Sequence, residues 1–150
     1  MVYLKQSLLK GYNVLDASRI LVGAHCSTML ADMGANVIKI EQRKTGDETR
    51  HWGPPFRGAD KTATYFMSLN RNKKSLTLDL KHPEGKQIVK DLISKQTDVF
   101  IENFPPAKIR KLGIDYESVK TYNPALVYAS VGGFPQHSDW ADKAAFDLTI

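Results

Sequence analysis

The side chains in this sequence that could do chemistry are mainly carboxylates, and several of them stand directly after short apolar runs. The polar residues that end these runs are Asp16, Glu41, Asp79, Glu102 with Asn103, and Ser130. If the runs are parallel strands, their ends share one edge of a sheet, where open α/β sheets bind ligands. We therefore expect a binding rim at this edge, with Glu41 facing a ribose as in nucleotide-binding sheets. The alternative is that polar residues simply mark where the chain leaves the core.

Most other chemistries are excluded by spacing. The histidines are His25, His51, His82 and His137. No two of them are four residues apart, and the single cysteine, Cys26, cannot build a zinc site. Cys26 lies on an apolar helical face, so we expect a buried structural thiol. Only Gly23 follows the first run, where a dinucleotide-binding loop needs three spaced glycines, and neither a P-loop nor a GxSxG elbow is present. Any bound nucleotide must therefore be held by side chains and helix N-termini.

The composition is that of an ordinary globular domain, with 150 residues, 42% hydrophobic and 25% charged. No stretch reaches the roughly 18 apolar residues of a membrane span. A single cysteine excludes an internal disulfide and indicates a reducing compartment. The net charge of +5 favours an anionic partner, but the basic residues are scattered and not interleaved with aromatic ones. We therefore expect neither a membrane nor a nucleic acid as partner.

Segments of strand and helix type alternate along the chain. The runs of strand type occupy residues 12–16, 36–41, 75–80, 98–103 and 126–131. The first helix ends at Gly34, and its expected buried face consists of Val22, Cys26, Met29, Leu30 and Met33. A second helix starts at Pro83, and Asp115 can cap a short third helix that buries Tyr116, Val119 and Tyr122. This alternation predicts an α/β fold with a doubly wound, mostly parallel sheet.

Residues 43–74 interrupt the alternation. The segment is rich in glycine, proline and charge, and its residues 62–70 are compatible with a helical turn. Loops of this length inside a domain are commonly functional, which favours a lid, while the alternative is a solvated surface excursion.

Three stretches together resemble the N-terminal part of the family III CoA-transferases, the family of formyl-CoA and carnitine CoA-transferases and of α-methylacyl-CoA racemase. They are residues 8–56, beginning "LLKGYNVLDASRILVG", residues 65–85, "YFMSLNRNKKSLTLDLKHPEG", and residues 98–134, beginning "DVFIENFPPAKIRKLG". The motifs "WGPPF" and "LNRNKKS" look like those of the transferases. The resemblance implies a Rossmann-like large domain that binds coenzyme A along its strand ends, in an interlocked homodimer. Residues 1–150 would form an incomplete large domain.

The resemblance also implies which positions contact coenzyme A. Carried over residue by residue, they are Arg19, Leu21, Val22, Gln42, Leu78, Asp79, Leu80, Lys81, Asn103, Phe104, Pro105, Lys111, Ala144 and Asp147. Lys81 and Lys111 suit phosphates as mobile point charges, and Asn103 suits an adenine or pantetheine amide. Gln42 replaces an arginine that is common in the family, and Pro105 replaces a glycine. Without the family pattern, each lysine would more commonly be a solvated surface residue.

The resemblance implies an enzyme that moves coenzyme A from an acyl-CoA to a free carboxylate or dicarboxylate. In the family a nucleophilic aspartate attacks the thioester, and the matching position lies beyond Ile150, whereas Asp147 matches a cofactor-side position. We therefore expect no catalytic residue and no activity in these 150 residues alone. Coenzyme A is expected as substrate, with no permanently bound cofactor and no metal, in the cytoplasm or mitochondrial matrix. The alternatives are an acyl-CoA racemase of the same family and a non-catalytic coenzyme A-binding module.

Overall fold

Five parallel strands form the central sheet of the computed structural model, which describes residues 7–143 and 145. The strands are β1 (Asn13–Asp16), β2 (Asn36–Gln42), β5 (Lys73–Leu78), β6 (Val99–Glu102) and β7 (Val127–Ser130). Their order across the sheet is β5-β2-β1-β6-β7. Each strand begins and ends within two residues of the predicted run. The chain therefore has the predicted α/β fold, and its order reverses between β1 and β6, where doubly wound sheets bind ligands.

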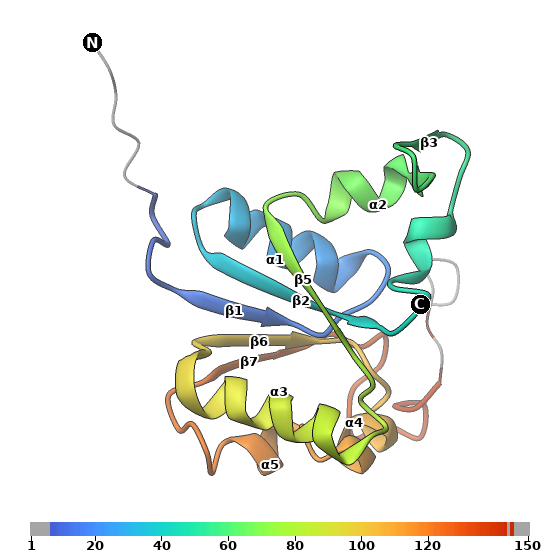
Figure 1. The fold of residues 1–150 in the computed structure, drawn as a ribbon. Helices are drawn as coiled ribbons and strands as arrows, with labels where there is room; N and C mark the ends of the chain where they lie inside the picture. The colour runs from blue at the N-terminus through green and yellow to red at the C-terminus, as the bar shows by residue number, and fades with distance from the viewer. Residues whose placement is uncertain (1–6, 144, 146–150) are drawn as a thin grey trace.

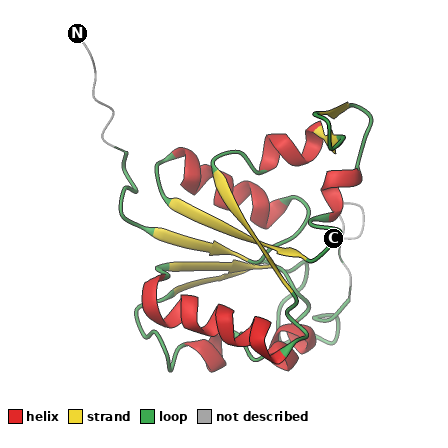
Figure 2. Cartoon of the chain, in the orientation of Figure 1, coloured by secondary structure: helices red, strands yellow, loops and turns green. Residues whose placement is uncertain are grey.

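Helices cover both faces of this sheet, as Figures 1 and 2 show. The helices on one face are α1 (Val22–Asp32) and α2 (Thr64–Leu69), and those on the other are α3 (Pro83–Gln96), α4 (Pro106–Leu112) and α5 (Tyr116–Val119). The larger apolar core lies between the sheet and α3–α5 and includes Phe100 and Ile114. A smaller core lies under α1 around Val37 and Ile101.

Local chemistry explains where the helices on the second face begin. Pro83 occupies the first turn of α3, and the side chain of His82 accepts a hydrogen bond from the Glu84 N–H at 3.4 Å. At Gly85 an added Cβ would lie 2.1 Å from the Asp79 carbonyl oxygen, so this residue lets α3 approach the end of β5 closely. Asp115 caps α5 as predicted, accepting a hydrogen bond from the Ser118 N–H.

The segment between β2 and β5 is folded. It contains a 3₁₀ helix, η1 (Glu48–His51), a two-stranded hairpin of β3 (Phe56–Arg57) and β4 (Thr62–Ala63), and α2 at the predicted helical turn. The Trp52 and Tyr65 rings pack with centroids 5.7 Å apart, and the Arg50 guanidinium lies 3.8 Å from the Phe66 ring centroid. These contacts make the segment an ordered excursion attached to the sheet.

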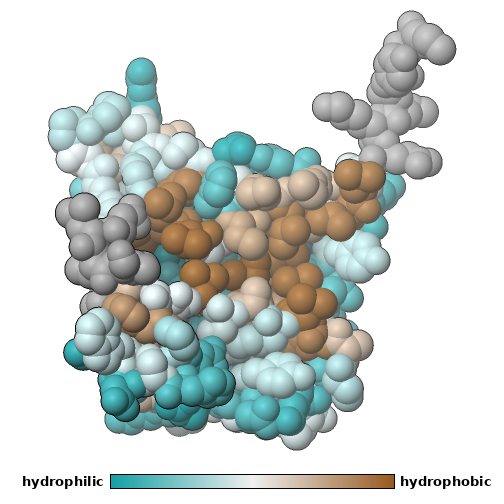
Figure 3. Space-filling model, turned by 180° about the vertical axis from the view of Figure 1, so that it is seen from behind, coloured by the Kyte–Doolittle hydropathy of each residue, from teal (hydrophilic) through white to brown (hydrophobic). Residues whose placement is uncertain are grey.

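The prediction of the buried face of α1 is wrong. The helix buries mainly small residues, namely Gly23, Ala24, Ser27, Thr28 and Ala31. Val22, Met29 and Met33 are 57%, 48% and 42% exposed, and Cys26 is exposed as well. The reason is close approach, because an added Cβ at Gly23 would lie 2.3 Å from the Ser18 Cβ, so only small side chains fit beneath the helix. Figure 3 shows a broad apolar area on the back of the molecule, opposite the view of Figure 1.

Two tyrosines expected to be buried by α5 are instead about half exposed. Val119 is fully buried, whereas Tyr116 and Tyr122 are 49% and 46% exposed.

Within the described residues, no helix is both long and apolar enough to cross a bilayer.

Candidate functional site

A cavity of about 520 Å³ opens at the carboxyl ends of β1, β2, β5 and β6. Its walls come from four segments, and the lining residues are Ala17, Arg19, Ile40, Glu41, Gln42, Arg43, Lys44, Leu78, Asp79, Leu80, Lys81, Phe104, Lys108 and Leu112. This is the edge at which doubly wound sheets bind ligands, beside the strand pair where the order reverses. The cavity is therefore the candidate binding site of the described chain.

The lining is strongly basic. The cationic side chains are Arg19, Arg43, Lys44, Lys81 and Lys108, whereas Glu41 and Asp79 are the lining acids. The charge of Glu41 is already neutralised by Arg50, with which it forms an ion pair at 2.7 Å. Arg19 pairs with Glu48 at 3.6 Å, but both side chains are more than one third exposed, so this pair is weak. The site therefore has an excess of positive charge that suits an anionic ligand.

One aromatic ring lies close to two of these cations. Phe104 is buried to 7% exposure and packs on the main core. The Arg19 Cζ lies 5.3 Å and the Lys108 Nζ 5.0 Å from its ring centroid. The ring gives the basic site an apolar surface that both cations approach.

Asn103 holds the loop that carries Arg19. Its Oδ1 accepts a hydrogen bond from the Arg19 N–H at 2.9 Å, and its Nδ2 donates to the Arg19 carbonyl at 2.9 Å. The amide expected to contact adenine or pantetheine therefore binds the protein backbone on both sides. We conclude that Asn103 acts on the cavity through the position of Arg19.

A buried ionic network also holds the loop after β1 in place. Lys39 is 1% exposed, and its Nζ donates to the Ser18 carbonyl at 2.9 Å and pairs with Asp47 at 3.0 Å. Asp47 Oδ2 in turn accepts the N–H of Ile20, a β-branched residue held at φ 65°. Such a conformation is strained and persists only when its surroundings impose it. Buried charges thus fix the backbone on both sides of Arg19.

Asp16 and Lys73 complete the network and contradict part of the expected rim. Asp16 is fully buried and accepts hydrogen bonds from Ser18, Ser27 and Lys73, the last at 3.2 Å. The Lys73 Nζ also donates to the Ala24 carbonyl at 2.8 Å. Burial lowers the pKa of Lys73 to about 8, although Asp16 opposes this shift. Asp16 is therefore a structural anion and does not face a ligand.

Glu41 does not face a ribose either. Its two carboxylate oxygens accept hydrogen bonds from Arg50 Nε and Nη2, each at 2.7 Å, and Ser75 Oγ donates to it at 2.7 Å. Burial alone would raise the pKa of Glu41, but these bonds and that from the Asp47 N–H lower it to about 2. The carboxylate anchors the excursion to β2, and its interpretation as a ribose ligand is wrong.

Glu102 is a buried acid of a different kind. It is 0% exposed, its Oε2 accepts the Phe104 N–H at 2.8 Å, and its Oε1 has no hydrogen-bond partner within the described residues. Burial raises the pKa of Glu102 above its ordinary value of 4.5. This strand-end acid also belongs to the protein interior, where burial disfavours its charged form.

Glu102→Gln should therefore remove a pH-dependent loss of stability. A carboxyl group with a raised folded-state pKa stabilises the fold fully below the unfolded value of 4.5 and loses that contribution as pH rises through the folded value. Glutamine keeps the acceptor for Phe104 without ionising, so the variant should be more stable than wild type at pH 8 and equal to it near pH 4. Urea unfolding across this pH range measures the difference. A wild type whose stability relative to the variant does not fall with rising pH would contradict the assignment.

The structure brings together half of the positions carried over by resemblance. Those that line the cavity are Arg19, Gln42, Leu78, Asp79, Leu80, Lys81 and Phe104. Asn103 acts on Arg19, and four others lie outside the lining: Leu21, Val22, Pro105 and Lys111. Ala144 and Asp147 lie outside the described residues. The cationic lining residues that sequence reasoning missed are Arg43, Lys44 and Lys108.

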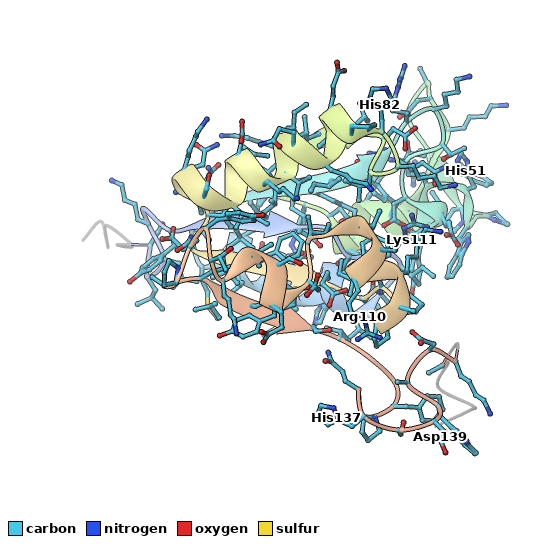
Figure 4. The ribbon with its side chains drawn as sticks, turned by 90° about the horizontal axis from the view of Figure 1, so that it is seen from below. His51, His82, Arg110, Lys111, His137 and Asp139 are labelled. Carbon is cyan, nitrogen blue, oxygen red and sulfur yellow. The ribbon has the colours of Figure 1, made fainter. Side chains whose placement is uncertain are left out.

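The histidines do not form a metal centre in the described part of the chain, where no group of three metal-binding side chains converges. Figure 4 shows His51, His82 and His137 on three separate segments, with His137 and Asp139 on the loop after β7. The same view shows Arg110 and Lys111 on α4. The cavity, rather than the histidines, can bind and orient an anionic ligand, through its cations and an aromatic ring.

The fold and this site define a doubly wound α/β protein with a basic binding cavity at its strand ends. A model of CoA-transferase family III matches residues 9–150, and the chain belongs to that family. It is 44% identical to a succinate–glutarate CoA-transferase of Agrobacterium fabrum and 41% identical to the human succinyl-CoA:glutarate CoA-transferase, covering 95% and 93% of this chain. A solved CAIB/BAIF family protein from Brucella suis superimposes with a TM-score of 0.87 at 42% identity, covering 93% of this chain.

The chain spans about a third of the length of these relatives. The match covers 36% of the Agrobacterium protein, 31% of the human protein and 37% of the Brucella chain.

Proposed function

We propose that this chain binds coenzyme A and its thioesters in the strand-end cavity, as the coenzyme A-binding part of a CoA-transferase. The observation that carries the proposal is the basic cavity at the point of strand-order reversal, in a chain of CoA-transferase family III. Coenzyme A combines phosphates with an adenine and a pantetheine arm, which carries both apolar and amide groups. The cavity offers Arg19 and Lys81 for the phosphates, and the Phe104 ring with Leu78 and Leu80 for the rest.

The proposed reaction transfers coenzyme A from an acyl-CoA to a dicarboxylate. A nucleophilic carboxylate would attack the thioester carbon and expel the coenzyme A thiolate, giving a mixed anhydride. The thiolate would then attack the carbonyl carbon of the enzyme carboxyl, which releases the donor acid as a carboxylate and leaves an enzyme–coenzyme A thioester. The acceptor carboxylate would attack this thioester and expel the thiolate to form a second anhydride, and attack of the thiolate on the acceptor's carbonyl carbon would give the new acyl-CoA and free the enzyme carboxylate. The names of the relatives, which act on succinyl-CoA, succinate and glutarate, support dicarboxylates as this chain's substrate class.

The described residues contribute binding and orientation to this scheme. Asn103 and the buried pair of Lys39 with Asp47 fix the loop carrying Arg19, so that the cation is in place before the ligand arrives. Pre-formed positioning of this kind is a main source of rate enhancement in acyl transfer. The nucleophile, which the resemblance places beyond Ile150, and the interlocked homodimer belong to the same proposal.

Binding of coenzyme A by the folded chain tests the proposal. Lys81→Ala should weaken it by about 1–3 kcal/mol, because the lysine makes a charge-assisted contact with a phosphate. Asn103→Ala should weaken it through Arg19, and Asn103→Asp, which loses the donor to the Arg19 carbonyl and adds a negative charge beside the anion site, should weaken it at least as much. Isothermal titration measures each dissociation constant.

The matched control is Lys95→Ala, which removes the same charge from the last turn of α3, outside the cavity lining. Circular dichroism must show that each variant is folded. Equal affinity for Lys81→Ala, Asn103→Ala and wild type would contradict the strand-end site.

A further inference from the structure

Three cations from three separate segments meet in the cavity. Arg19 follows β1, Lys81 follows β5, and Lys108 lies on α4, and all three line the same space. Arg19 and Lys108 both approach the Phe104 ring, at 5.3 and 5.0 Å from its centroid. The fold thus collects positive charge from distant parts of the sequence at one place.

Protein groups do not balance this charge. Lys81 and Lys108 form no ion pair among the described residues, and Arg19 has only the exposed Glu48. Asp79 lines the cavity and its Oδ1 accepts the Lys81 backbone N–H at 2.9 Å, so its single negative charge offsets only part of the three positive ones.

The pKa of Lys108 agrees with this imbalance. Burial lowers it first, and the charges of Arg19 and Lys81 lower it further, while Glu48 opposes the shift. Positive charges that repel one another in the free protein are stabilised most by a ligand that carries several negative charges.

We propose that Arg19, Lys81 and Lys108 form one phosphate-binding subsite, with Lys108 as a ligand-contacting residue that the family resemblance does not assign. The inference rests on the proposed function, in which the cavity receives coenzyme A. The ligand chemistry is a phosphate group with at least two negative charges, which three cations around one space can each contact. Arg19 and Lys108 both lie near the Phe104 ring, which places their charges in the same part of the cavity.

Coenzyme A offers two such groups, its pyrophosphate and its 3′-phosphate. Three probes separate them: coenzyme A, dephospho-coenzyme A, which lacks the 3′-phosphate, and inorganic pyrophosphate. Each is titrated into wild type, Lys108→Gln and the control Lys95→Gln, which removes a lysine charge outside the cavity lining. Lys108→Gln should be at least as stable as wild type, because it relieves repulsion among the three cations, and urea unfolding checks this.

We expect Lys108→Gln to weaken coenzyme A binding roughly five- to fifty-fold, as for the loss of one charge-assisted contact. Lys95→Gln should leave it unchanged. An equal loss for dephospho-coenzyme A and pyrophosphate assigns the subsite to the pyrophosphate, whereas a loss confined to coenzyme A assigns it to the 3′-phosphate. The difference should shrink in 1 M salt, which screens ionic contacts.

The outcomes separate this inference from the proposed function. Unchanged binding of all three probes by Lys108→Gln overturns the inference and leaves the proposed function standing. Binding of pyrophosphate that needs Lys108, without binding of either coenzyme, supports the subsite and contradicts the proposed function. A wild type that binds none of the probes overturns both.

Discussion

Asp47→Ala is expected to lower the free energy of unfolding by about 3–5 kcal/mol, the usual cost of leaving a buried charge without its partner. Asp47 is 4% exposed and pairs with the fully buried Lys39 at 3.0 Å. After the change, the Lys39 ammonium keeps only the Ser18 carbonyl and the more distant Asp16, at 3.9 Å. Thr49 loses its acceptor as well, and the strained Ile20 loses the bond to its N–H. Urea unfolding followed by circular dichroism measures the change.

Three further variants make this test specific. Asp47→Asn keeps the acceptor oxygen and removes the charge, so its loss should be smaller. Asp91→Ala removes a surface acid paired with Lys95 and should cost less than about 1 kcal/mol. Adding Lys39→Met to Asp47→Ala removes both charges, and the double variant should be less destabilised than the sum of the single ones. Strict additivity, or a loss for Asp47→Ala no larger than for Asp91→Ala, would show that the buried pair does not hold the loop.

Most of the fold was predictable because its inner strands contain short apolar runs. A strand buried on both faces of a parallel sheet, such as β6 with Phe100 and Ile101 fully buried, needs apolar residues at successive positions. The turn chemistry between the runs is equally local, since Pro83, Gly34 and Asp115 act within one turn of the helix they begin or end. α4 was missed, although Pro106 at its start and Gly113 at φ 68° after its end are ordinary helix signals.

The buried faces were less predictable because they depend on distances between elements. Residue type favours Met29 and Met33 over Ser27 and Thr28 as the inner face of α1, yet the close approach at Gly23 admits only small side chains. Likewise, a lysine within an apolar run, such as Lys39, does not show by itself that it will join a buried network of four charges. Lys39 is buried because Asp47 returns to it from the folded excursion, a contact that no local pattern encodes.

The candidate site was predictable at the level of the sheet edge and only partly at the level of side chains. Any polar residue that ends a strand lies near that edge, but whether it faces the cavity depends on its partners. Glu41 turns to Arg50, and Asn103 turns to the Arg19 backbone. Lys108 reaches the cavity from α4, the helix that sequence reasoning missed. Sequence reasoning therefore missed Lys108 because it missed the helix α4 that carries it.

The 150 residues alone are expected to show no CoA-transferase activity. The reaction needs a free carboxylate held within attacking distance of the thioester carbon, together with donors for the developing oxyanion. Of the acids that line the described cavity, Glu41 is bound by Arg50 and Ser75, and Asp79 accepts the Lys81 N–H. Loss of a positioned nucleophile removes on the order of 7–11 kcal/mol of barrier lowering in the most favourable intramolecular cases. Binding of coenzyme A without turnover is the expected result.

Incubation with succinyl-CoA and other acyl-CoA donors, each with glutarate or another dicarboxylate, tests this expectation. Product formation and a hydroxylamine-trappable acyl-enzyme are the two readouts, and a longer protein that includes segments matching the remaining length of the relatives is the positive control. That protein should turn over, and the 150-residue chain should not, although both bind coenzyme A. Asp147→Asn is the decisive variant, because it tests whether this acid could act as the nucleophile. The resemblance matches Asp147 to a cofactor-side position, and the residue lies outside the described residues. Turnover by the pure 150-residue chain that disappears in Asp147→Asn would make Asp147 the nucleophile and contradict its assignment to the cofactor side.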